Sequence, residues 1–204
     1  MFIERPPQIF RRLFPGVLFR KESDENPGVV YLTFDDGPIP EVTPWVLDTL
    51  DRFGVKATFF MVGQNIERNP LLFEEVKRRG HKVANHSLHH IRGFNITADD
   101  YLKDVDACEK YTQSGIYRPP HGILTPSQRK ALQEKYELVM FDLVTRDYSK
   151  RVSAKDVFNN IRRYARNGSI IVFHDSLKSF EKLKTALPDS LSFLLSEGFR
   201  FALL

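Results

Sequence analysis

The chain has 204 residues, of which 42% are hydrophobic and 27% charged, and this composition is typical of one soluble globular domain. Its formal net charge of +4 comes mostly from scattered lysines and arginines, and no long basic stripe or aromatic–basic repeat supports nucleic-acid binding. A single cysteine, Cys108, excludes an intrachain disulfide and is typical of a packed small hydrophobic residue. We therefore expect no nucleic-acid partner.

The first 28 residues are predicted to form an arm that packs on or flanks a single domain spanning residues 29–204. The arm lacks the unbroken apolar run of a secretion signal, and no stretch approaches the roughly 20 apolar residues of a membrane span. We therefore expect no transmembrane segment and a cytoplasmic location. A basic group in the arm leaves peripheral contact with a membrane surface open; its members are Arg11, Arg12, Arg20 and Lys21.

After the arm, seven apolar, β-rich runs alternate with amphipathic helical segments. The predicted strands are 29–34, 57–62, 81–84, 116–118, 138–143, 170–173 and 199–203. The predicted helices are 42–53, 71–79, 98–112, 127–134, 157–166 and 180–195, with an interruption of the last one at Pro188 left open. This alternation predicts an α/β fold with a helix-covered parallel sheet, and both an open doubly wound sheet and a closed barrel fit it.

Unusual polar residues gather directly after the predicted strands. The five clusters are Asp35–Asp36, His86–His90, Arg118–Gly122, Arg146–Tyr148 and His174–Asp175. Because the carboxyl ends of parallel strands share one face of the sheet, these clusters are expected to meet there. Scattered solvent-exposed residues would not be sorted in this way, so the pattern indicates an active site.

Two histidines in the segment HSLHH, His86 and His90, are spaced i, i+4, which would put both rings on one face of a helical turn. His89, at i+3, could substitute for one of them geometrically. Two histidines and one carboxylate are a recurrent catalytic metal set that leaves coordination positions open, and Asp36 is the natural third ligand. The sequence therefore predicts a divalent metal held by these side chains.

Asp35 then need not bind the metal, and it can take the proton from a metal-bound water as that water attacks. A turn alone would explain Gly37 and Pro38 but not two adjacent acids. Arg118 is expected to hold Asp35 bidentately, the alternative being a surface ion pair of little value. The stiff segment Pro119–Pro120 would present the backbone N–H of His121 to a developing oxyanion.

His174 follows an apolar strand, where a satisfied core histidine is the simpler interpretation. On the same face as the other clusters, however, a general acid is favoured, because an unperturbed imidazole titrates near 6.5. Asp147 is the expected partner that fixes the tautomer and raises the pKa of His174, and Asp142 and Asp175 are less favoured alternatives.

The motifs TFDDGP, HSLHH, RPPHG, TRDY and VFHD stand in this order, and they closely resemble the polysaccharide deacetylase family, also called the NodB-homology or carbohydrate esterase family 4 domain. The resemblance covers roughly residues 29–204. It implies a distorted (β/α) barrel of about seven parallel strands and metal-dependent removal of acetyl groups from amino sugars. It also implies zinc as the metal, or else cobalt, nickel or manganese.

The resemblance extends to individual residues. Asp35 matches the catalytic base, and Arg118 matches the arginine that orients it. Asp36, His86 and His90 match the metal ligands.

Four more positions follow from the same resemblance. The backbone of His121 stands where the family has its oxyanion donor, Asp147 matches the aspartate that tunes the acid, and His174 matches the acid. The family commonly has an aromatic residue in place of His121 and often a tryptophan in place of Tyr148. Both side chains are expected to shape the sugar pocket.

The resulting hypothesis is a metal-dependent hydrolase that removes N-acetyl groups from an amino sugar or polysaccharide, with a metal-bound water attacking the acetamide and acetate as a product. An O-acetyl carbohydrate esterase on the same site is an alternative. A hydrolase of cyclic imides or ureides without a metal is another, although the retained metal set disfavours it. The alternative from another class is a non-catalytic glycan-binding module. The sequence predicts no particular sugar or oligomeric state.

Overall fold

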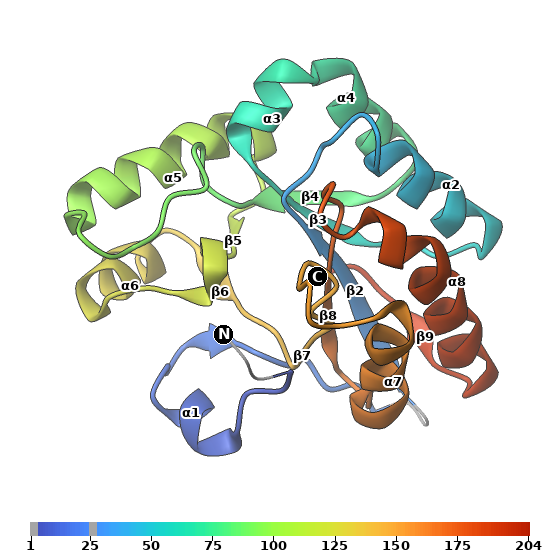
Figure 1. The fold of residues 1–204 in the computed structure, drawn as a ribbon. Coiled ribbons are helices and arrows are strands. Elements are labelled where there is room, and N and C mark those ends of the chain that lie inside the picture. Colours follow the sequence, from blue (N-terminus) through green and yellow to red (C-terminus); the bar gives the residue numbers. More distant parts are fainter. Residues whose placement is uncertain (1–3, 25–27) are drawn as a thin grey trace.

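The computed structural model describes residues 4–24 and 28–204, and within them the chain forms a curved parallel sheet with helices on its outer side (Figure 1). Neighbouring strands follow the order β1-β6-β5-β4-β3-β2-β8-β7, and β9 pairs with β2. The described strands are β1 (Val17–Leu18), β2 (Val29–Asp35), β3 (Thr58–Met61), β4 (Lys82–Asn85), β5 (Ile116–Tyr117), β6 (Glu137–Val139), β7 (Leu143–Val144), β8 (Ile170–His174) and β9 (Arg200–Phe201). The predicted distorted (β/α) barrel is confirmed.

Helices cover the outer face of the sheet and connect its parallel strands, as a parallel arrangement requires (Figure 1). The described helices are α1 (Gln8–Arg12), α2 (Thr43–Arg52), α3 (Gly63–Arg68), α4 (Pro70–Arg78), α5 (Ala98–Thr112), the 3₁₀ turn η1 (Pro120–Gly122), α6 (Pro126–Gln133), α7 (Ala154–Tyr164) and α8 (Phe180–Ser196). Among the described residues, none of these helices has the length and apolar character needed to cross a membrane.

Strand β2 lies at the centre of the fold and is buried along its whole length. Successive side chains of a strand point to opposite faces. Leu32 and Phe34 therefore pack in the core beneath the helices, whereas Val29 and Tyr31 pack in a second core inside the barrel. Asp35 continues the second series, so the strand itself directs this carboxylate to the inner side of the barrel.

The seven predicted strand regions all contain strands, but the predicted strand 138–143 is two strands, β6 and β7. Between them the backbone changes neighbours: the N–H of Met140 donates to the carbonyl of Leu18 in β1, and the N–H of Asp142 donates to the carbonyl of Ile170 in β8. Strand β1 was not predicted, since two residues are too few to show an alternating pattern.

The six predicted helices are present, with ends that differ by up to three residues. Helix α8 continues through Pro188. Pro188 has no N–H to donate to the carbonyl of Lys184, four residues earlier. Lys184 is an exposed residue, so water can bond to this carbonyl instead. The short helices α1 and α3 were not predicted.

The N-terminal arm packs against the sheet at both β6 and β7. Strand β1 pairs with β6, and the backbone N–H of Met140 donates to the carbonyl of Leu18 at 2.7 Å. On the other side, the N–H of Val144 donates to the carbonyl of Glu4 at 2.8 Å. The arm thus lies between β6 and β7, which are not neighbours in the sheet. The division into an arm of residues 1–28 and a domain of residues 29–204 stays a prediction.

Candidate active site

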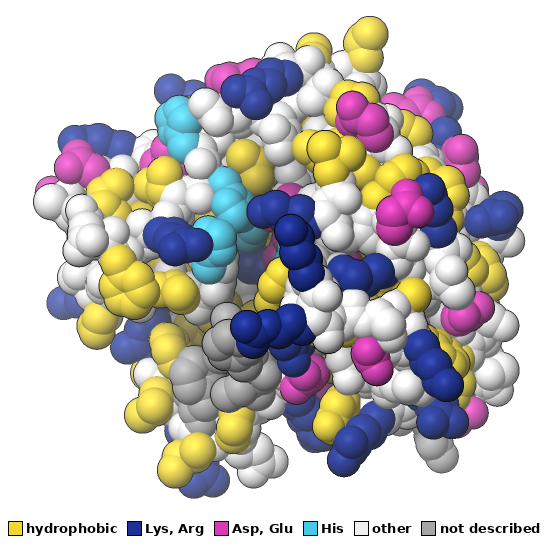
Figure 2. Space-filling model, in the orientation of Figure 1, with side chains coloured by type: hydrophobic (Ala, Val, Ile, Leu, Met, Phe, Trp, Pro, Cys, Tyr) yellow, Lys and Arg dark blue, Asp and Glu magenta, His cyan; other side chains and the backbone are white. Residues whose placement is uncertain are grey.

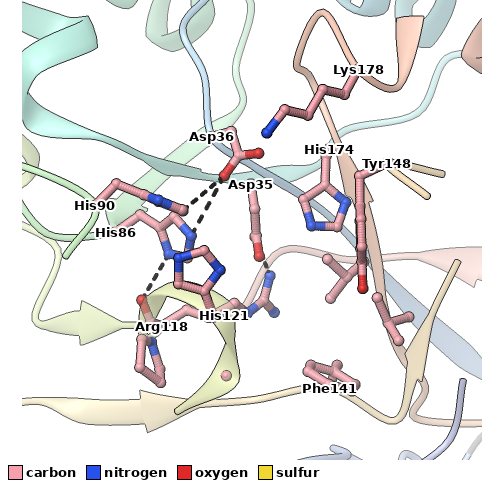
Figure 3. Close-up of a pocket in the computed structure, with 14 residues that line it drawn as sticks. Asp35, Asp36, His86, His90, Arg118, His121, Phe141, Tyr148, His174 and Lys178 are labelled. Carbon is pink, nitrogen blue, oxygen red and sulfur yellow. Dashed lines mark hydrogen bonds and ion pairs between the residues drawn. The ribbon is translucent and has the colours of Figure 1, made fainter. Parts of the chain in front are cut away.

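A cavity of about 220 Å³ opens at the carboxyl ends of the strands (Figure 3). Its lining residues are Asp35, Asp36, His86, His90, Arg118, Pro119, His121, Gly122, Phe141, Val144, Tyr148, Val172, His174 and Lys178. All the predicted site residues except Asp147 are in this lining, and Asp147 is bonded to one of its members. Asp35 and His174 are 139 positions apart in the chain (174 minus 35). These predicted site residues converge because their strands end at one face of the sheet.

Two adjacent aspartates reach the same cavity because the strand ends between them. Asp36 has a φ of 85°, in the left-handed region, so the alternation of faces in β2 stops at this residue. The turn is held from both sides: the side-chain amide of Asn65 donates to the carbonyl of Asp36 at 2.8 Å, and the N–H of Gly37 donates to Asp175 Oδ1 at 3.1 Å. A Cβ at Gly37 would lie 2.1 Å from Asp175 Oδ2, so only glycine fits.

The side chains of Asp36, His86 and His90 form a group whose donor atoms all lie within 4.8 Å of one another. Asp36 Oδ1 lies 3.2 Å from His90 Nε2 and 3.9 Å from His86 Nε2. His86 Nδ1 lies 2.8 Å from the carbonyl oxygen of Arg118, which can only accept, so this nitrogen carries the proton. The unprotonated Nε2 therefore faces a carboxylate oxygen, and a cation between them would satisfy both.

Burial strengthens this assignment of the His86 tautomer. His86 is buried, and its burial lowers the pKa of the imidazole to about 4, so the ring is neutral at neutral pH. For Asp36, burial raises the pKa of the carboxyl group, but the hydrogen bond to His90 and the charge of His174 outweigh it and lower that pKa overall. A neutral imidazole and an ionised carboxylate are the protonation states that divalent metals bind.

The prediction of a helical turn at residues 86–90 is wrong. The segment after β4 is a loop in which Ser87 and His90 have φ values of 65° and 54°. The loop nevertheless brings the rings of His86 and His90 to a centroid distance of 5.1 Å. His89 does not substitute for either of them, because its side chain is turned away and hydrogen-bonds to Asp104.

Asp35 is paired with a buried arginine, as predicted. Arg118 Nη1 donates to Asp35 Oδ1 at 2.6 Å, and the arginine is 2% exposed. The guanidinium is fixed by further acceptors, the hydroxyl of Thr33 at 2.8 Å and the carbonyl of Met140 at 3.0 Å, and it lies 3.9 Å above the ring of Phe60. Arg118 can therefore hold the Asp35 carboxylate in one orientation at the cavity wall, although through one oxygen rather than bidentately.

His174 faces Asp35 across paired strands. The two residues are register partners in the parallel ladder of β2 and β8, so both side chains lie on the same side of the sheet. His174 Nδ1 lies 2.7 Å from Asp147 Oδ1, and the His174 backbone N–H donates to the other carboxylate oxygen at 2.8 Å. Asp142 and Asp175, the less favoured partners, lie in other contacts.

The pKa of His174 is set by two opposing effects. Burial lowers it, but the negative charge of Asp147 and its hydrogen bond raise it to about 9. His174 is therefore protonated at neutral pH, with its Nε2–H available to the cavity because Nδ1 is engaged by Asp147.

Aromatic and apolar side chains complete the cavity. The ring of His121 packs on His90 at a centroid distance of 4.7 Å, and the ring of Tyr148 packs on His174 at 4.8 Å. His121 has a φ of 60°, and burial lowers the pKa of its ring to about 4. A separate apolar wall is formed by Phe141, Val144 and Val172.

Sequence reasoning missed three contributions to this site. Asp175 fixes the turn after β2 by accepting from Gly37 and from the hydroxyl of Thr43 at 2.6 Å. Thr33 accepts a hydrogen bond from Arg118 and so helps to hold it. In the sequence, only the inward position of Thr33 on β2 could have suggested this contact. Lys178 lines the cavity from the loop after β8, and no spacing or motif distinguishes it from other lysines.

Comparisons with known proteins agree with this geometry. A family model described as Polysaccharide deacetylase matches residues 22–139. A Peptidoglycan-N-acetylglucosamine deacetylase of Bacillus cereus is 30% identical over 188 residues, which cover 88% of each chain. A relative of the same name in Listeria monocytogenes, PgdA, is 32% identical over 178 residues, which cover 84% of this chain and 37% of the relative, so this chain spans little more than a third of that protein.

Solved structures share the fold. A peptidoglycan N-acetylglucosamine deacetylase in complex with 4-naphthalen-1-yl-N-oxidanyl-benzamide has a TM-score of 0.87 at 30% identity, over 97% of this chain and 94% of that chain. A family 4 carbohydrate esterase from Streptomyces lividans in complex with acetate has a TM-score of 0.75 at 27% identity, over 86% and 92%. A CE4 family pseudoenzyme from Bacillus anthracis has a TM-score of 0.78 at 23% identity, over 98% and 71%, which is a likeness of fold alone. Any statement about activity therefore depends on the site residues.

Proposed function

Because the chain belongs to the polysaccharide deacetylase family, we propose that it is a metal-dependent hydrolase that removes N-acetyl groups from an amino sugar or polysaccharide and releases acetate. The observation that carries this proposal is the convergence of three units on one cavity: the Asp36–His86–His90 group, the Asp35–Arg118 pair and the His174–Asp147 pair. Each unit has a separate chemical capacity, and the proposed hydrolysis of the acetamide uses all three.

The group formed by Asp36, His86 and His90 fits a divalent cation. Its donors are two imidazole nitrogens and one carboxylate oxygen, a set typical of catalytic zinc, and we propose Zn²⁺ with Co²⁺, Ni²⁺ or Mn²⁺ as alternatives. When bound, the metal supplies Lewis-acid activation of water and of the acetamide carbonyl. The carbonyl of Arg118 supports the site by fixing the proton of His86 on Nδ1.

Asp35 is proposed as the general base that accepts the proton of the attacking water. Its Oδ1 accepts from Arg118, and its other oxygen is left to the cavity. The positive charge of Arg118 balances the carboxylate and fixes its orientation, so that the base is positioned before the substrate binds.

His174 is proposed as the general acid that protonates the departing amine. With a pKa raised to about 9, the ring carries its proton at neutral pH, and Asp147 directs Nε2–H into the cavity. The backbone N–H of His121 is proposed as a donor to the oxyanion that forms at the acetyl carbon. The apolar wall of Phe141, Val144 and Val172 provides a surface on which the acetyl methyl group can pack.

The substrate proposed is an N-acetylated glycan with glucosamine-type units. The names of the relatives in Bacillus and Listeria, which act on peptidoglycan N-acetylglucosamine, support this class. An O-acetylated sugar is the alternative, supported by the similarity to the esterase of Streptomyces lividans. A cytoplasmic place of action stays a prediction from the sequence.

Acetate release and metal content test the proposal together. The purified protein is expected to contain about one divalent ion per chain by elemental analysis and to release acetate from N-acetylglucosamine oligomers. Removal of the ion with a strong chelator should abolish turnover, and Zn²⁺ or Co²⁺ should restore it, while Asp36→Ala should lower the metal content. Full turnover after stringent chelation would contradict the proposal and favour a metal-independent amidase.

The two remaining alternatives give different results. An esterase would prefer O-acetylated sugars and would depend little on the acid, because an alkoxide can leave without prior protonation, whereas the nitrogen of an amide must be protonated before it leaves. His174→Ala should therefore reduce amide hydrolysis far more than ester hydrolysis. Tight glycan binding with no acetate release under any of the metals would indicate a non-catalytic module.

A further inference from the structure

Two loops at the mouth of the cavity carry positive charges that the proposed chemistry does not use. Lys178 lies in the loop between β8 and α8, lines the cavity, and extends its ammonium group toward the space beside Asp36 and His174 (Figure 3). Arg92 lies in the loop between β4 and α5, two residues after His90. His90 and Lys178 both line the cavity, so the loop that carries Arg92 reaches the cavity within two residues of it.

Neither cation is paired with another residue of the described part of the chain. The structure records no ion pair or hydrogen bond between Lys178 or Arg92 and another described residue, and both are exposed. Neighbouring cations on this face differ: Lys182 donates to the carbonyls of Asp147 and Ser149 at 2.6 and 2.8 Å, and Arg146 pairs with Glu4 at 2.5 Å. Lys182 and Arg146 hold loops in place, whereas the other two are free to bind a ligand.

The acids around the cavity are already matched without these two cations. Asp35 pairs with Arg118, Asp147 pairs with His174, and Asp36 belongs to the group that fits a divalent cation. The mouth therefore carries surplus positive charge, and basic side chains surround the exposed histidines in the space-filling view (Figure 2). Such a focused positive field attracts and orients negatively charged ligands.

Each cation also has an exposed apolar neighbour. Phe94 follows Arg92 by two residues and is 60% exposed, and Leu177 precedes Lys178 and is 63% exposed. A sugar ring presents apolar C–H faces as well as polar edges, so an apolar side chain next to a cation suits a glycan that carries a charge. Lysine offers a point charge on a flexible stem, and arginine offers a planar fork for carboxylate or phosphate oxygens.

We propose that Lys178 and Arg92 form a subsite for an anionic substituent, a carboxylate or a phosphate, on the glycan whose acetamide enters the cavity. This inference rests on the proposed function and deepens it, because it selects charged amino-sugar polymers over neutral ones. The contact is made before and during the reaction alike, so it should lower KM rather than raise kcat.

The test compares glycans with and without an anionic group, and the free acid and its methyl ester are the pair matched most closely in shape. The substrates are a neutral N-acetylglucosamine tetramer, a tetramer alternating with N-acetylmuramic acid that bears a free carboxylate, the methyl ester of that tetramer, and a 6-phosphorylated N-acetylglucosamine tetramer. The ratio of kcat/KM for an anionic substrate to that for the neutral tetramer is expected to fall about threefold to tenfold in Lys178→Gln, mainly through KM, and further when Arg92→Gln is added. The ratio should also fall with added salt.

Two matched variants show whether an effect of Lys178→Gln comes from the loss of charge at this position. Lys178→Arg keeps the charge and should retain most of the ratio. Lys184→Gln removes a lysine of α8 that pairs with Glu181, away from the cavity, and should leave all rates unchanged. An unchanged ratio in Lys178→Gln, or an equal fall in Lys184→Gln, overturns the inference. A preference for the carboxylated or for the phosphorylated tetramer identifies which anion the subsite accepts.

The inference and the proposed function can fail separately. Acetate release from all the tetramers with no charge preference would keep the function and overturn the subsite. If the wild-type protein releases no acetate from any of them, the proposed function fails, and calorimetric binding of the same glycans to the wild type and to Lys178→Gln then decides the subsite. Equal affinity of the wild type for neutral and anionic tetramers would overturn it.

Discussion

Two buried aspartates in this fold, Asp35 and Asp142, are both paired with arginine, yet they occupy opposite chemical situations. Asp142 is fully buried beneath the N-terminal arm, and both of its oxygens are engaged. Oδ1 accepts from Arg11 at 2.5 Å and from Arg166 at 2.7 Å, and Oδ2 accepts from Arg166 at 3.0 Å and from the hydroxyl of Ser169 at 2.7 Å. Within residues 4–24 and 28–204, the carboxylate of Asp35 accepts one hydrogen bond, from Arg118, and it lines the cavity.

The difference lies in the oxygen that remains available. A carboxylate with all of its acceptor sites engaged can stabilise a fold, but it cannot take a proton without breaking several charge-assisted hydrogen bonds. A carboxylate with one oxygen hydrogen-bonded and the other unengaged is held in one orientation and can still accept a proton. Asp142 therefore joins the arm to the domain, while Asp35 is suited to chemistry.

Asp35→Asn should have the largest effect on activity. The amide oxygen can still accept from Arg118 but cannot act as a base, so kcat for acetate release is expected to fall about 10²–10⁴-fold. The metal content should stay near that of the wild type, because Asp35 is not in the ligand group. Turnover close to the wild-type value, with metal bound, would contradict the base assignment.

Asp142→Asn should reverse this pattern and act mainly on stability. The substitution leaves three arginines around one neutral amide, since Arg5 also lies 3.7 Å from the carboxylate. Breaking a buried ion pair from one side costs about 3 kcal/mol in the free energy of unfolding, which urea titration can measure. Its effect on kcat should be far smaller than that of Asp35→Asn.

A control variant separates burial from charge. Asp48 pairs with Arg79 on the surface, so Asp48→Asn should change the free energy of unfolding by only about 0.5 kcal/mol. Equal losses in Asp48→Asn and Asp142→Asn would refute the structural role of the buried cluster.

The stability provided by Asp142 should also depend on pH. Burial raises the pKa of this carboxyl group, but the hydrogen bonds from Arg166, Arg11 and Ser169 outweigh burial and lower it from 3.8 to about 2. A lowered pKa in the folded state stabilises the fold above the pKa of the unfolded chain, and the contribution is lost as pH falls from about 4 to about 2. Across this window the stability of the wild type should fall more steeply than that of Asp142→Asn. Parallel pH curves for the two proteins would argue against the lowered pKa.

The catalytic side chains could be predicted from the sequence because each follows an apolar run. Val29 to Phe34 and Ile170 to Phe173 read as strands, and in a parallel sheet the residues that end such strands must meet. The partnership of Arg118 with Asp35 follows from the same rule. This part of the site is fixed by strand direction, which a short stretch of sequence can reveal.

The parts of the fold and the site that the sequence did not predict depend on contacts between distant segments. The left-handed turn at Asp36 is held by Asn65 and Asp175, which are 29 and 139 residues away (175 minus 36). The loop at 86–90 lacks the helical turn that its spacing indicated, and the arm strand β1 is too short to be recognised. Charge alone could not have separated Asp35 from Asp142, because the sequence does not say which oxygens are engaged.

A third buried aspartate, Asp147, extends the comparison, and its expected effect on activity is smaller than that of Asp35. It does not take a proton itself but raises the pKa of His174 against the opposing influence of burial, to about 9. Because protonated His174 is the proposed acid, kcat/KM should fall as pH rises through about 9 in the wild type. Asp147→Asn removes the charge that raises this pKa, so the alkaline limb should move down to about pH 6.5 or below. At pH 7 the loss should be roughly threefold to tenfold, smaller than for Asp35→Asn, since part of the imidazole stays protonated. An alkaline limb that does not move in Asp147→Asn would mean that another group limits the reaction at high pH.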